Sequence, residues 1–234
     1  MTLVNAFGNG LFMTVNVLFF TRGLHLKVSQ VGVGLTLAAL CGVLASVPAG
    51  RAADRWGSKR VLMVLVVAEA VGMASYYLVH SYAAFAVLAC AVTAVDRGSN
   101  AVRNTLYAQA LPKDTRVAGR AYLRAVTNVA MGAGASLAAL ALQADTRQAY
   151  LAAILTDAAT FVAVAVMLPP IRVAPPSIGG SSPAAVGTRP RSALRDFPFL
   201  VVTLISSLLA VQFAVIEIGV PLWLVQSTHA PRVL

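Results

Sequence analysis

Hydrophobic residues form long runs along the chain, and short segments rich in charged residues and glycine separate them. Seven runs have about the ~20 residues that an α-helix needs to cross the hydrocarbon core of a bilayer. They span residues 3–21, 31–49, 61–79, 83–107, 122–142, 150–168 and 199–225. The pattern predicts an all-α integral membrane protein.

Composition supports this prediction and argues against a soluble domain. Hydrophobic residues make up 59% of the chain, charged residues 11%, and the mean hydropathy is +0.79. The net charge of +10 does not indicate nucleic-acid binding, because the basic residues lie between the runs rather than in one patch. The sequence has no phosphate-binding glycine loop and no metal-ligand spacing, so we expect no enzyme activity, no metal and no cofactor.

One connection between runs is much longer than the others. Residues 169–198 contain seven prolines together with glycine and serine, which is typical of a flexible linker. We therefore expect three parts. They are a six-helix transmembrane bundle at 1–168, a cytoplasmic linker at 169–198, and a seventh helix at 199–234 that begins an incomplete second bundle.

The basic residues also predict the orientation in the membrane. Most of the 18 lysines and arginines fall in the connections after the second, fourth and sixth runs. Cytoplasmic loops carry an excess of lysine and arginine, so these connections are expected in the cytoplasm together with the amino terminus.

The connection between the second and third runs combines charge and glycine in a short segment. Residues 50–60 read GRAADRWGSKR. This segment resembles the signature loop of the major facilitator superfamily, written G-x-L-a-D-R-x-G-R-K, which joins that family's second and third helices. The residues that carry the resemblance, or lie beside it, are Gly50, Asp54, Arg55, Gly57, Lys59 and Arg60. Two positions depart from the pattern, since Ala52 replaces the leucine and Ser58 the first basic residue after the second glycine.

The resemblance implies a secondary transporter that moves a small solute by alternating access between two six-helix bundles. Each bundle of this family contains a 3+3 inverted repeat, and the solute site lies near the bilayer midplane. The resemblance also implies a multi-pass protein of the plasma membrane, with gating by the signature loop and efflux of a hydrophobic or cationic compound as a family-level expectation. The expected partners are a small-molecule substrate, protons and the lipid bilayer, with no nucleic acid.

Ionisable side chains inside the predicted helices are the next candidates for function, because charge is costly in a bilayer. Polar residues recur at helical spacing on the fourth run, so one face of this helix must meet water or other polar groups. The segment 97–101, RGSNA, resembles the family's R-x-x-Q-G motif, which implies a role for Arg97 in proton coupling. Carboxylates removed from water can exchange protons near neutral pH. The proton-coupling candidates are Asp96, Arg97 and Glu217, and the substrate-cavity candidates are Asn5, Asn9, Asn16, Asn100, Asn104 and Gln212.

Three further charged residues have two interpretations each. Arg103 either extends to the membrane interface or pairs with Asp54 in a cytoplasmic charge network, as the resemblance implies. Glu69 and Asp157 are either proton-exchanging carboxyl groups or members of structural pairs. They lie on helices that the family places farther from the cavity, so structural pairing is favoured for both.

Small residues recur every four positions on the second run, from Gly34 to Gly50. Such a stripe allows close approach of another helix. The resemblance implies that the helix packing against this stripe belongs to the carboxy-terminal half, which the chain lacks. Seven helices would then need a second polypeptide or a second copy to complete the cavity. The alternative is a truncated or transporter-derived membrane protein that binds or scaffolds without transport.

Overall fold

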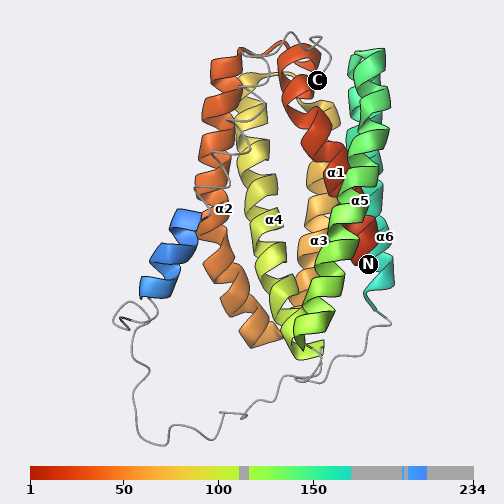
Figure 1. The fold of residues 1–234 in the computed structure, drawn as a ribbon. Coiled ribbons are helices and arrows are strands. Elements are labelled where there is room, and N and C mark those ends of the chain that lie inside the picture. Colours follow the sequence, from red (N-terminus) through yellow and green to blue (C-terminus); the bar gives the residue numbers. More distant parts are fainter. Residues whose placement is uncertain (111–115, 170–196, 198–199, 210–234) are drawn as a thin grey trace, which may run out of the picture. The chain divides into compact units, whose positions relative to one another are not determined.

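The fold is described from a computed structural model, in which residues 1–110, 116–169, 197 and 200–209 are defined. The chain divides into two compact units, Met1–Ser177 and Ile178–Leu234, which are described separately. The described part of the first unit contains six long helices (Figure 1). They are α1 (Thr2–Leu18), α2 (Val28–Trp56), α3 (Ser58–Ser75), α4 (Tyr82–Ala110), α5 (Arg116–Ala144) and α6 (Arg147–Met167). A π-helical turn, η1 (Phe19–Gly23), extends α1, and a 3-10 turn, η2 (Tyr76–Leu78), extends α3.

The first six predicted helices are confirmed. Within the described residues, five helical segments are long and apolar enough to cross a membrane: Thr2–Gly23, Val28–Trp56, Ser58–Leu78, Val117–Ala144 and Arg147–Met167. Helix α4 has the length but not the apolar composition, because it carries Asp96, Arg97 and Arg103. Of the seventh predicted helix, the stretch Leu200–Leu209 is described and is helical. Gln212, Glu217 and nearly all of the 169–198 linker lie outside the described residues.

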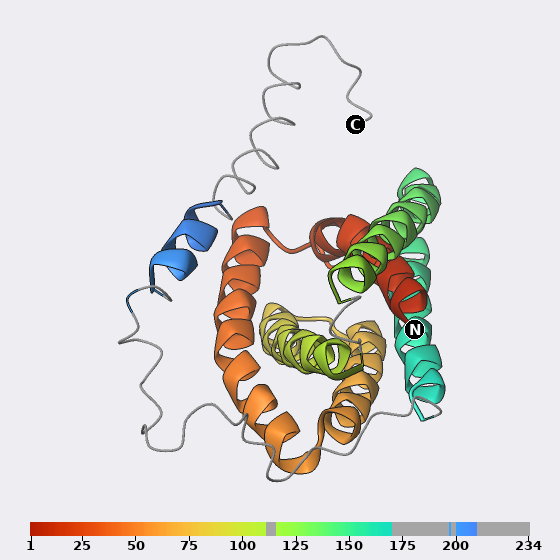
Figure 2. The same cartoon turned by 60° about the horizontal axis from the view of Figure 1, so that its bottom comes forward.

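The helices of the first unit pack across its two halves rather than within them. Helix α4 lies between α2 and α3, and α1 packs against α5 and α6 (Figure 2). When α1, α2 and α3 are matched in order with α4, α5 and α6, the α2–α4 pair corresponds to α1–α5, and the α3–α4 pair corresponds to α1–α6. Helices α3 and α6 also pack together, and this pair corresponds to itself. This is the packing expected of two related three-helix repeats, so the structure supports the predicted 3+3 bundle.

Glycines allow the closest of these approaches. A Cβ atom on Gly134 of α5 would lie 2.1 Å from the Phe7 carbonyl oxygen of α1, and one on Gly10 of α1 would lie 2.3 Å from the Met131 carbonyl oxygen of α5. Both obstructing atoms are backbone atoms, which cannot rotate away. Helices α1 and α5 therefore touch along their backbones, as small residues permit in membrane helices.

The predicted partner of the small-residue stripe on α2 is wrong for the part of the stripe from Gly34 to Gly42. Gly34, Ala38 and Gly42 are buried. A Cβ on Gly34 would lie 2.5 Å from the Phe85 ring, and one on Gly42 would lie 2.7 Å from the Arg97 side chain. Both neighbours belong to α4, so this part of the stripe packs within the chain. At Gly50 a Cβ would meet nothing within 4 Å in the described part of the chain.

Polar contacts tie the helix ends together at the end of the bundle opposite the α2–α3 connection. Arg22 at the end of η1 forms an ion pair of 2.6 Å with Asp145, which follows α5. The buried Tyr150 hydroxyl donates a hydrogen bond to the same carboxylate. The Tyr150 hydrogen bond and the Arg22 charge hold the pKa of Asp145 below its ordinary value.

This arrangement predicts a pH-dependent contribution to stability. A carboxyl group whose pKa is lowered by folding stabilises the fold above its unfolded pKa of about 3.9, and the effect disappears as the pH falls through the folded value. Asp145→Asn should therefore lower the thermal unfolding temperature in detergent near neutral pH, and the difference from wild type should shrink in acid. Asp54→Asn, which removes an exposed carboxylate at the other end, is the control. Equal effects of the two substitutions would contradict the assignment.

Candidate functional site

The α2–α3 connection is tighter than the sequence suggested. Helix α2 continues to Trp56 and α3 begins at Ser58, so most of the expected loop is helical. Gly57 joins the two helices with φ of +89°, a conformation that residues with a Cβ rarely adopt. This explains the second glycine of the 50–60 segment, because another residue would strain the turn.

The charged side chains of this connection lie at the surface. Arg51, Asp54, Arg55 and Arg60 are exposed, and Lys59 is half-buried. Lys59 donates a hydrogen bond of 2.6 Å to the Pro169 carbonyl oxygen after α6. We call this part of the bundle the basic end, defined by Arg51, Arg55, Lys59 and Arg60.

Arg103 lies inside the bundle rather than at the basic end. Its guanidinium donates a hydrogen bond of 3.2 Å to the Asn5 side-chain oxygen on α1, and its exposed fraction is 9%. In this structure Arg103 faces α1, and no ion pair joins it to Asp54 among the described residues. The reason is that α4 continues to Ala110, which leaves Arg103 about two turns inside the helix and directed at α1.

Glu69 lies in the middle of α3 and is 1% exposed. Arg103, Asp96 and Asp157 are close enough to interact with it electrostatically. Ser99 of α4 faces it, but the two side chains do not meet hydrogen-bond geometry, and neither carboxylate oxygen of Glu69 has a hydrogen-bond partner among the described residues. Glu69 is thus a deeply buried carboxyl group without a direct partner in that part of the chain.

Asp157 on α6 is also fully buried. One of its carboxylate oxygens accepts a hydrogen bond of 3.3 Å from Thr160, and the other has no partner within the described residues. Both side chains lie against Gly8 of α1, where a Cβ would come within 2.2 Å of the Asp157 and Thr160 oxygens. Gly8 therefore provides the space in which these groups sit.

Asp96 and Asn100 extend this group of residues along α4. The Asn100 side chain donates a hydrogen bond of 3.0 Å to the Asp96 carboxylate, which is half-buried. Arg97 is exposed and packs over Gly42 of α2, while Asn104 is exposed on the next turn. We call Asn5, Glu69, Asp96, Ser99, Arg103 and Asp157 the buried polar cluster. Its members come from α1, α3, α4 and α6.

Comparison of the chain with models of protein families identifies the kind of protein that contains this cluster. The model described as Major Facilitator Superfamily matches residues 1–232. The chain belongs to the Major Facilitator Superfamily. It is therefore a membrane transporter of that superfamily, whose members are generally transporters rather than enzymes. No curated protein and no solved structure gave a significant match.

The superfamily assignment confirms the resemblance that residues 50–60 suggested, but the predicted site residues are only partly brought together. Asn5, Asp96 and Asn100 belong to or adjoin the buried polar cluster. Asn9 and Asn16 are half-buried on α1, and no hydrogen bond joins them to the cluster in the described part of the chain. In the described residues there is no group of three or more histidine, cysteine, aspartate or glutamate side chains able to hold a metal ion.

Sequence reasoning underrated two members of the cluster. Glu69 and Asp157 were expected to be structurally paired, yet each has a carboxylate oxygen without a hydrogen-bond partner among the described residues. A signal was present, because each is a single acidic residue inside an otherwise apolar run. What the sequence could not show is that the two carboxyl groups lie close enough together to interact electrostatically.

Proposed function

We propose that this superfamily member is a proton-coupled secondary transporter and that the buried polar cluster carries the proton. The single observation that supports the proposal most is the burial of Glu69 with no hydrogen-bond partner in the described part of the chain. An ionised carboxylate is costly in such a place, and taking up a proton removes that cost. Any movement that admits water to Glu69 would favour release of the proton.

Arg103 provides the electrostatic counterpart in this proposal. Arg103 is the only buried cationic side chain in the described part of the chain, and it interacts electrostatically with both Glu69 and Asp96. Asp157 interacts with Glu69 and Asp96, so three carboxyl groups share this interior with one buried guanidinium and cannot all be ionised without excess negative charge. The cluster is thus suited to hold at least one exchangeable proton, with Arg103 held in place by Asn5.

The half-buried side of α4 is the proposed route between the cluster and the solute. Asp96, Asn100 and Asn104 lie on successive turns. Asp96 and Asn100 are half-buried, whereas Asn104 and the neighbouring Arg97 are exposed. Helices α1 and α4 meet here through Asn5 and Arg103 and through a 2.8 Å hydrogen bond between the Thr2 and Tyr107 hydroxyls. We propose that this face, with Asn9 and Asn16 of α1, lines the solute cavity. Gln212 and Glu217 remain predicted contributors.

The remaining elements of the proposal follow from the superfamily. The basic end gates the cytoplasmic side, with Asp54 as the gating residue, the amino terminus is cytoplasmic, and the protein acts at the plasma membrane. Export is the direction to test first. A second bundle, from the rest of a longer chain or from another polypeptide, would complete the cavity.

Glu69→Gln tests the proposal directly. Glutamine keeps the size of glutamate but cannot release a proton, so transport should lose its dependence on a pH gradient. Flux of ethidium, a fluorescent organic cation, would be measured in membrane vesicles at several imposed gradients. The control is Asp145→Asn, which neutralises an exposed carboxylate at the end of the bundle opposite the α2–α3 connection. Its transport should depend on the pH gradient as in wild type.

Infrared spectroscopy gives a second readout that does not require the natural solute. The wild-type protein should show a protonated carboxyl absorption that changes with pH and is lost in Glu69→Gln. A Glu69→Gln protein with wild-type pH dependence in both measurements would exclude Glu69 as the proton carrier. Solute binding without flux would instead favour a binding or scaffolding role.

A further inference from the structure

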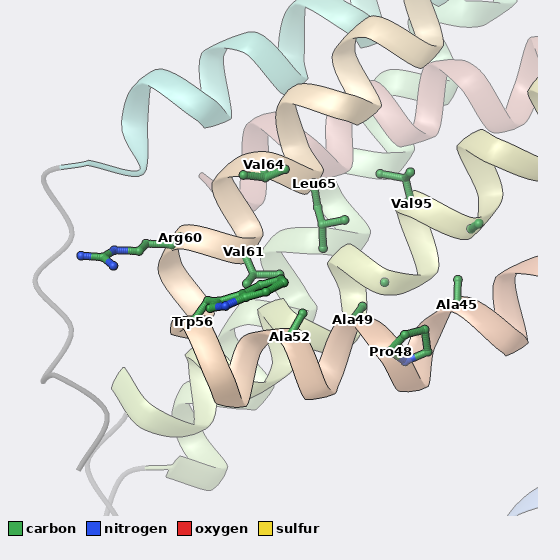
Figure 3. Close-up of a pocket in the computed structure, with 12 residues that line it drawn as sticks. Ala45, Pro48, Ala49, Ala52, Trp56, Arg60, Val61, Val64, Leu65 and Val95 are labelled. Carbon is green, nitrogen blue, oxygen red and sulfur yellow. The ribbon is translucent and has the colours of Figure 1, made fainter. Parts of the chain in front are cut away.

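A groove on the outside of the bundle lies apart from the buried polar cluster. It has a volume of about 460 Å³ and runs between α2 and α3 over the surface of α4 (Figure 3). Small residues form its floor, among them Ala49 and Ala52 of α2 and Gly98 of α4, while Val64 and Leu65 of α3 form a wall. The volume lies within the range of about 300–1,000 Å³ that is usual for small-molecule sites.

The lining of the groove is apolar except at one end. Arg60 is its single charged residue among those described, and it lies where α2 turns into α3. Figure 3 shows Trp56 and Val61 at this end of the groove, with the Arg60 side chain extending beyond them. Trp56 is 62% exposed and Val64 is 68% exposed, so the groove is open to the surroundings of the bundle.

The residue types at this end of the groove are typical of the boundary between lipid tails and headgroups. Tryptophan is enriched at this level of a bilayer, and arginine extends from apolar surroundings toward the headgroups. The segment at this end of the groove carries a net positive charge. Residues 50–60 contain Arg51, Arg55, Lys59 and Arg60 against one acidic residue, Asp54.

We propose that this groove binds an anionic phospholipid, with one acyl chain between α2 and α3 and the phosphate group at Arg60. The apolar floor would accommodate the acyl chain, and the positive charge of Arg60 would favour an anionic headgroup. Anionic lipids are concentrated in the cytoplasmic leaflet, on the side where the basic end is expected. The neighbouring basic residues add a general attraction, whereas Arg60 lies at the groove itself.

Trp56 provides a fluorescent reporter at this site. The chain contains two tryptophans, so Trp223→Phe leaves Trp56 alone. The full chain with this substitution would be placed in nanodiscs of phosphatidylcholine containing a small fraction of a lipid with brominated acyl chains, which quench nearby tryptophan. Brominated phosphatidylglycerol should quench Trp56 at a concentration about fivefold lower than brominated phosphatidylcholine does, the effect expected for about one basic residue.

Two further substitutions separate the groove from general surface charge. Arg60→Gln should remove the preference for phosphatidylglycerol, whereas Arg120→Gln, an exposed arginine of α5 outside the groove, should leave it intact. Ala49→Leu should fill the floor and reduce quenching by both lipids. The proposal is overturned if the two brominated lipids quench equally in the wild-type background, or if Arg60→Gln and Arg120→Gln have the same effect.

Discussion

Gly134→Ala is expected to force α1 and α5 apart and to lower the free energy of unfolding by about 3 kcal/mol, the upper part of the range for overpacked interiors. The added Cβ would lie 2.1 Å from the Phe7 carbonyl oxygen and 3.0 Å from the Leu11 nitrogen. Both are backbone atoms of α1, so the clash cannot be relieved by a change of rotamer. Thermal unfolding of the purified protein in detergent would measure the effect.

Gly132→Ala is the matched control. Gly132 lies on the same helix two residues earlier, and a Cβ there would meet nothing within 4 Å in the described part of the chain. Alanine is the better helix former by about 1 kcal/mol, so this substitution should be neutral or slightly stabilising. Similar unfolding temperatures for the two variants would mean that α1 and α5 do not approach as closely as the structure shows.

Arg103→Met should be the most damaging substitution in the buried polar cluster. Leaving a buried hydrogen-bond acceptor without its donor costs about 1–3 kcal/mol. Here Asn5 loses its hydrogen-bond donor, and Glu69 and Asp96 each lose one favourable electrostatic interaction, although Arg97 remains near Asp96. The free energy of unfolding near neutral pH should fall accordingly, and thermal unfolding in detergent would detect it.

A double substitution tests whether charge is the cause. Arg103→Met combined with Glu69→Gln removes a carboxyl group together with the guanidinium, so it should recover stability at high pH, where Glu69 is ionised, and little at low pH, where Glu69 already holds its proton. Arg97→Met removes an exposed arginine from the same helix and should cost much less. If the single Arg103→Met protein is as stable as wild type, the carboxyl groups do not depend on Arg103 for compensation and its proposed role is wrong.

The helices were predictable from the sequence because their apolar runs are long and contain few charged residues. The six described transmembrane runs coincide with α1–α6, although α2 extends seven residues beyond the predicted end at residue 49. Arg51, Asp54 and Arg55 suggested a loop there, yet the hydrogen bonds of the helix continue because those side chains reach the surface. Charge marks the end of a membrane-embedded segment, but it does not mark the end of a helix.

The partners of individual side chains were not predictable, because they depend on which helix faces which. Spacing along α4 gave a polar face, but the turn of Arg103 toward Asn5 follows from the crossing of α4 and α1. In the same way, the stripe around Gly42 predicted close packing but not its partner, which is Arg97 of α4. Sequence patterns thus predicted which helix faces are polar or closely packed, and the fold determined which faces meet.

The interlocked arrangement of the two repeats has a consequence for synthesis. The extensively packed pairs all join a helix of α1–α3 to a helix of α4–α6, and α1–α3 have little contact among themselves. The ribosome delivers α1–α3 first, before their partners exist. These helices must therefore persist in the bilayer as separate inserted segments, stabilised by their own apolar length. The buried polar cluster is completed only after α6 has entered the membrane, because α6 carries Asp157.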